Sequence, residues 1–149
     1  MKNLICILLI ISLVGCATMS TIESKNRQNL NRLVVNMPKT EVLNTMGTDT
    51  ITCYKSELLM LSILSLGCLL PVYLHDTQKI TNPYRSEIWQ SKVSGETLEI
   101  VYYYTDTKKA DYAITDDELT PLVFCNHRLI GWGWGFLRDV EAKYEIRLR

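Results

Sequence analysis

This sequence has few histidines and no net charge. It contains two histidines, His75 and His127, and its 16 basic residues balance 16 acidic ones. So few histidines, with no paired carboxylates among apolar residues, leave little for acid–base or nucleophilic catalysis, and we expect no enzymatic activity. The balanced charge excludes a basic surface for nucleic acid. No glycine-rich phosphate loop is present, so we predict neither a cofactor nor a small-molecule substrate.

A metal site is not expected either. The stretch "DYAITDDEL" (residues 111–119) is similar to the second half of a calcium loop, but Thr107 and Lys109 occupy the matching ligand positions. Tyr112 stands where the sharp turn of such a loop requires glycine. Residues 115–118 are better explained as a capping box that begins one helical turn, ended at Pro121.

The N-terminus has the pattern of a secretory leader. Lys2 is followed by an apolar run over residues 4–14 and by Leu-Val-Gly-Cys, which ends at Cys16. This ending resembles the bacterial lipobox, which implies cleavage before Cys16 and acylation of its thiol, so we predict a lipoprotein signal peptide over residues 1–15. Residues 16–26 are predicted to be a tether, and Ala17 suggests the outer membrane in the sorting pattern that the lipobox resemblance implies.

Three cysteines remain for the folded part: Cys53, Cys68 and Cys125. An odd number in an oxidising compartment allows one disulfide and a free thiol, or three buried thiols. Cys53 and Cys125 both lie in strand-like stretches and are the pair that we would test first.

The remaining residues, 27–149, are predicted to form a single α+β domain. Residues 27–35 have helical spacing of Leu30, Leu33 and Val34, and Pro38 is placed to open a second helix that stops at Gly47. The stretch "MPKTEVLNTMGT" (residues 37–48) resembles the helix signature of the SmpA/OmlA (BamE-like) small outer-membrane lipoproteins.

Strand patterns dominate the second half. A strand is expected near residues 50–55, a hairpin joins residues 86–92 to 97–105, and a second hairpin joins 121–125 to 128–133 through Asn126-His127. Residues 136–146 are predicted to add a C-terminal helix. The order of helices and strands resembles the SmpA/OmlA fold, which implies two N-terminal helices packed on a small antiparallel sheet, as in β-lactamase-inhibitor proteins.

An apolar insertion at about residues 57–80 departs from that family pattern. Residues 58–74 contain no charge, but as a helix they measure about 25 Å, short of the roughly 30 Å hydrocarbon core. Gly67 and Pro71 interrupt such a helix. We expect a helix or helical hairpin that is buried or lies at the bilayer surface, and the alternative is a spanning helix.

Aromatic residues supply the candidates for partner binding. The run "GWGWG" (residues 131–135) is interpreted as a strand with Trp132 and Trp134 on one face, either packed under the helices or exposed to a partner. Tyr103 faces opposite to its tyrosine neighbours, so we expect one tyrosine to lie near solvent. Tyr84 and Arg85, in a predicted turn, complete the set, with Arg85 a contact for an acidic partner or a lipid head group.

These observations predict a non-enzymatic lipoprotein of the bacterial envelope. It is expected to be attached to the periplasmic face of the outer membrane through acylated Cys16, and to bind an envelope protein as an accessory module in outer-membrane assembly or maintenance. The alternative is an inner-membrane protein in which residues 58–74 span the bilayer and the rest is a periplasmic regulatory or inhibitor-type domain.

Overall fold

The computed structural model describes residues 21–62, 69–92, 94–109 and 113–144, with the backbone alone described within 53–78. The predicted leader, Cys16 and Cys68 therefore lie outside the described residues. In chain order the elements are a helix over residues 21–30, α2 (Lys39–Met46), β1 (Thr50–Ser62), β2 (Leu69–Thr81), β3 (Arg85–Gln90), β4 (Thr97–Tyr104), the 3₁₀ turn η1 (Asp116–Glu118), β5 (Leu119–Cys125), β6 (Arg128–Trp132) and α3 (Trp134–Tyr144).

Four strands form an antiparallel sheet in the order β3-β4-β5-β6, as both predicted hairpins require. The turn between β5 and β6 is Asn126-His127, with φ of 49° and 62°. Positive φ at both central residues is what a two-residue hairpin needs, and His127 adopts it although glycine is the favoured residue there. The prediction of this hairpin from its turn residues is therefore confirmed.

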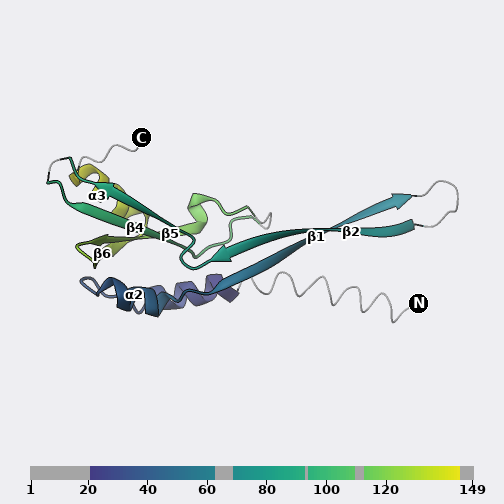
Figure 1. Ribbon diagram of the computed structural model, residues 1–149, viewed down its shortest axis with the longest axis horizontal. Coiled ribbons are helices and arrows are strands. Elements are labelled where there is room, and N and C mark those ends of the chain that lie inside the picture. Colours follow the sequence, from purple (N-terminus) through teal and green to yellow (C-terminus); the bar gives the residue numbers. More distant parts are fainter. Residues whose placement is uncertain (1–20, 63–68, 93, 110–112, 145–149) are drawn as a thin grey trace.

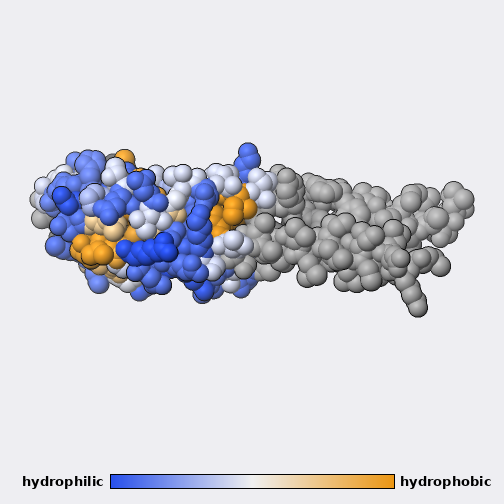
Figure 2. Space-filling view, turned by 90° about the horizontal axis from the view of Figure 1, so that it is seen from below, coloured by the Kyte–Doolittle hydropathy of each residue, from blue (hydrophilic) through white to orange (hydrophobic). Residues whose placement is uncertain are grey.

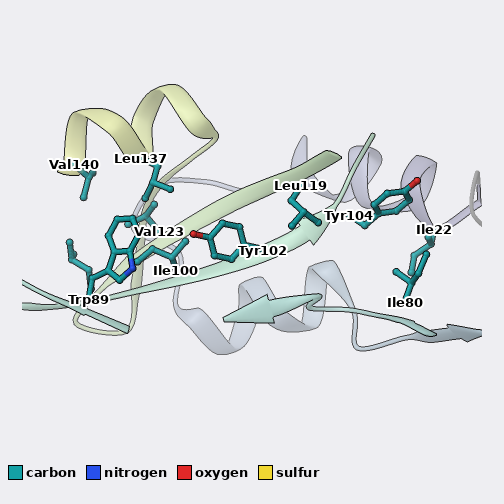
Figure 3. Packing of buried hydrophobic residues seen from close by; sticks show 11 residues of the cluster. Ile22, Ile80, Trp89, Ile100, Tyr102, Tyr104, Leu119, Val123, Leu137 and Val140 are labelled. Atoms are coloured by element: carbon teal, nitrogen blue, oxygen red, sulfur yellow. The ribbon is translucent and has the colours of Figure 1, made fainter. Parts of the chain in front are cut away.

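Helices cover both faces of the sheet (Figure 1). Side chains alternate along β4, so Leu98, Ile100, Tyr102 and Tyr104 face one way, and Val101 and Tyr103 face the other. The first set packs against Leu137 and Val140 of α3 and, at the other end of the sheet, against Ile22 and Ile80 (Figure 3). The second set packs against α2 through Val42 and Met46. The α+β fold with two N-terminal helices and a C-terminal helix is confirmed.

The first helix lies earlier in the chain than its pattern indicated. The structure has a helix over residues 21–30, not 27–35, and Val34 is 63% exposed. After the helix the chain turns towards the sheet, where the Asn36 amide donates to the Leu129 carbonyl oxygen at 2.7 Å. Ile22 and Asn26 are buried, so residues 21–26 are part of the folded body and the tether predicted to reach residue 26 was too long.

The apolar insertion is a β-hairpin, and the predicted helix over residues 58–74 was wrong. β1 pairs antiparallel with β2 from Thr50↔Thr81 to Ser62↔Leu69, and the two strands extend away from the body (Figure 1). β-Branched and aromatic residues at the start of β1 favour a strand, and Gly67 and Pro71 disfavour a continuous helix. A two-stranded sheet has an open edge on each strand, where proline costs no ladder hydrogen bond.

The alternative of a spanning helix over residues 58–74 was wrong for the same reason. Residues 58–62 and 69–74 belong to strands, and none of the helices in the described part of the chain has the length and hydropathy to cross a membrane.

Candidate partner-binding surface

Arg85 is held within the molecule by three groups. Its guanidinium lies 4.2 Å from the centre of the Tyr102 ring, and Nη2 is 2.9 Å from Oδ1 of Asp116. Nε lies 3.4 Å from Oε1 of Glu87. The Tyr102 hydroxyl donates to Glu87 at 3.3 Å, and burial, assisted by the charge of Glu87, raises the pKa of Tyr102 to about 12. Arg85 therefore already has acidic partners in its own chain.

The two tryptophans lie on opposite sides of the sheet, which corrects their predicted placement on one face. Trp132 ends β6 and packs with the residues beneath α2. Gly133 then has a φ of 88°, which ends the strand, so that Trp134 begins α3. The Trp134 indole donates to the Leu119 carbonyl oxygen at 2.7 Å and its ring centre lies 5.9 Å from that of Tyr102.

None of the three tyrosines of β4 lies at the surface, so the expectation of one near solvent was wrong. Tyr102, Tyr103 and Tyr104 are each at most 2% exposed, because helices cover both faces of the sheet. Burial raises the pKa of Tyr103 to about 12, and its hydroxyl has no hydrogen-bond partner among the described residues. Of the five predicted contact residues, Arg85 and Trp134 contact the Tyr102 ring and Tyr84 packs against the same core cluster. Trp132 and Tyr103 belong to the separate cluster beneath α2.

The strand β3 offers a surface that the sequence patterns did not reveal. It is the last strand on its side of the sheet, and no described residue pairs with its outer edge. Ile88, in its middle, is 75% exposed, and its neighbours on the same face, Ser86 and Gln90, are also exposed. The alternation of polar and apolar residues in the sequence could not reveal this surface. It does not indicate which strand lies at an edge of the sheet or how far α2 covers the sheet.

The backbone of β3 is oriented for pairing with another strand. Just beyond β3, the Ser91 amide donates to the Glu96 carbonyl oxygen at 2.9 Å, and hydrogen-bonded pairs alternate along an antiparallel ladder. Residues 85, 87 and 89 therefore bond to β4. Ser86, Ile88 and Gln90 direct their amide and carbonyl groups outward.

The opposite edge of the sheet is covered. The Leu129 amide in β6 donates to the Met37 carbonyl oxygen at 3.0 Å, and the Lys39 amide donates to the His127 carbonyl oxygen at 2.9 Å. Pro38 also forms a bridge with Arg128. The segment before α2 thus occupies the edge of β6, and β3 is the edge of this sheet that is left open in the described part of the chain.

The face beside Ile88 is polar and ordered. Glu99, the register partner of Ile88 on β4, accepts two hydrogen bonds from Nζ of Lys39, at 2.6 and 2.8 Å. On the side of the molecule that carries α2, hydrophobic residues form small patches among hydrophilic ones (Figure 2). A single exposed apolar side chain is common on protein surfaces, so the case for β3 as a binding surface rests on its open backbone edge.

The acidic stretch after β4 has a structural use. The buried carboxylate of Glu118 accepts hydrogen bonds from the amides of Lys108 at 2.7 Å, Lys109 at 3.3 Å and Thr115 at 3.0 Å. The contact with Thr115 is the predicted capping box, which is confirmed. No group of His, Cys, Asp or Glu within the described ranges is arranged to hold a metal ion.

Cys125 is a free thiol, and burial raises its pKa. The disulfide between Cys53 and Cys125 that the sequence suggested is therefore not formed in this structure.

Comparison with known proteins finds one family model that matches part of the chain. The model of a family described as "Protein of unknown function (DUF3192)" matches residues 75–138, which run from β2 into α3. No curated protein and no solved structure matches the chain. The likeness to the SmpA/OmlA lipoproteins therefore stays a prediction from the sequence.

Proposed function

We propose that this protein is a non-enzymatic lipoprotein of the bacterial envelope that binds a protein partner by adding an extended segment of that partner to the edge of β3. The lipobox ending at Cys16 supports attachment by acyl chains, and the helix signature at residues 37–48 supports a role like that of the SmpA/OmlA lipoproteins in outer-membrane assembly or maintenance. The partner class is a protein with an unpaired strand or an extended peptide.

The observation that carries the proposal is the contrast between the two edges of the sheet. Segment 36–39 covers β6 with backbone hydrogen bonds, whereas β3 directs the backbone groups of Ser86, Ile88 and Gln90 outward. Strand addition uses such groups for affinity, and alternate side chains for specificity. Folded proteins usually protect an open edge with charge, proline or a bulge. The charged residues of β3, Arg85 and Glu87, lie on the face that carries Tyr102, whereas the opposite face presents the uncharged Ser86, Ile88 and Gln90.

Site-specific photocrosslinking in cells tests this surface. A photoreactive residue at Gln90, at the end of the exposed face of β3, is expected to give a discrete adduct with an envelope protein. Ile88→Pro removes one outward amide donor without removing a bond to β4, so it should abolish that adduct while leaving the fold intact. The effect of Ile88→Glu should be similar, because it removes the apolar anchor.

Val35→Glu is the matched control, because Val35 is a second exposed aliphatic side chain, 58% exposed and outside the sheet. It should leave the adduct unchanged. An adduct that forms equally well in the Ile88→Pro protein would rule out strand addition at β3.

A further inference from the structure

The β1–β2 hairpin divides into a polar half and an apolar half at one level of its ladder. The charged residues of the two strands, Lys55, Glu57, Asp76 and Lys79, all lie on the side of the body. The boundary falls at the register pair Glu57↔Leu74. Beyond it, residues 58–62 pair with residues 69–73, and Ser62 is the one polar residue other than Tyr73 in these two arms.

Apolar residues occupy both faces of the outer half. Neighbouring positions in a strand alternate between faces, so Leu58 and Met60 lie on one face and Leu59 and Leu61 on the other. A strand that covers a protein core on one face has polar residues on the other, and this pattern is absent here. Among the described residues, no third strand pairs with this half of the hairpin.

The base of the hairpin lies beside the N-terminal part of the described helix over residues 21–30. Ile22, near the start of that helix, packs in the same cluster as Ile80 at the base of β2, and Lys25 forms an ion pair with Asp49, just before β1. Four residues lie between Cys16 and Thr21, so the two are at most about 17 Å apart, whereas β1 is about 40 Å long. A bilayer that holds Cys16 therefore lies within reach of the apolar half of the hairpin.

We infer that the apolar outer half of the β1–β2 hairpin is a second membrane contact, which lies along the lipid surface beside the acyl anchor. The hairpin does not cross the hydrocarbon core alone, because the outer edges of both strands would expose unpaired backbone groups to the lipid chains. At the level of the head groups, water satisfies these edges while the leucines bury apolar area. This inference uses the proposed anchor for its geometry, but the affinity of the hairpin for lipid is independent of acylation.

Vesicle flotation of the unacylated chain tests the inference. The mature chain with Cys16→Ala, produced behind a cleavable leader that lacks the lipobox, should float with vesicles of phosphatidylethanolamine and phosphatidylglycerol. The double variant Leu59→Glu/Val72→Lys changes a register pair to opposite charges, which support strand pairing but resist burial in lipid. We expect it to bind at least tenfold more weakly.

Thr52→Glu is the matched control, since it creates the same pair of charges opposite Lys79 in the polar half. It should float like the parent. Near-UV circular dichroism of the buried tyrosines verifies that each variant keeps the folded body.

Three results would overturn the inference: an unacylated parent that stays at the bottom of the gradient, equal flotation of the Leu59→Glu/Val72→Lys chain, or association of the unacylated chain into oligomers that hide the hairpin from vesicles. Because every protein in the experiment lacks the acylated thiol, none of these results bears on whether Cys16 is acylated in the natural chain.

Discussion

At the scale of a single residue, Tyr103 carries a buried polar group that lowers the stability of the fold. Its hydroxyl is buried beneath α2 without a hydrogen-bond partner among the described residues. An unsatisfied buried hydroxyl costs about 1–3 kcal/mol. Tyr103→Phe keeps the ring and removes that cost, so we expect the free energy of unfolding to stay equal or to rise by about 1 kcal/mol, measured by urea denaturation. Tyr102→Phe, which loses a hydrogen bond to Glu87, should be less stable than the parent.

The same side chain makes stability depend on alkaline pH. The pKa of Tyr103 in the folded protein is about 12, above the ordinary value of 10.0, because burial disfavours the charged form. The free energy of unfolding therefore keeps its full value below pH 10, where Tyr103 is neutral in both states. It falls as the pH rises from 10 towards 12, because the unfolded chain releases the proton first. Tyr103→Phe should lose less stability over this interval than the parent does. Parallel urea titrations at pH 9 and 11 measure the difference, and an identical loss in both proteins would show that folding does not raise the pKa of Tyr103.

At the scale of elements, Gly131 sets how closely α3 can approach β6. A Cβ atom at this position would lie 2.6 Å from carbon atoms of the Phe136 ring. Gly131→Ala is therefore expected to destabilise the protein by about 1–3 kcal/mol through overpacking. Combining it with Phe136→Leu makes room for the new methyl group and should recover part of the loss, measured by thermal unfolding of the single and double variants. A double variant no more stable than the sum of the two single effects would contradict this explanation.

The sequence correctly predicted those elements that are determined by residues adjacent in the chain. Pro38 and Gly47 bound α2, and Asn126-His127 forms the turn of the β5–β6 hairpin, as expected. Residues 58–74 were misread, because an uncharged stretch without clear alternation does not distinguish a helix from a strand. Whether the partner-binding candidates are exposed depends on helices that are distant in the sequence and pack over them. No pattern within β4 indicates that α3 covers Tyr102 while α2 covers Tyr103.

At the scale of the whole molecule, the chain combines a compact body with a long arm that leaves it at one end (Figure 1). The body presents an open strand edge at β3, and the arm carries an apolar half that points away from the body's own core. This division suits a protein held at a lipid surface by one end while its sheet edge stays available to a protein partner. Attachment through Cys16 is the claim on which the orientation of both surfaces depends.

Mass spectrometry of the N-terminal peptide from the protein purified out of membranes tests that claim most directly. We predict a chain that begins at Cys16, lacks residues 1–15 and carries acyl chains on the cysteine, and we predict that Cys16→Ser abolishes this modification. A leader still attached to an unmodified Cys16 would contradict the account.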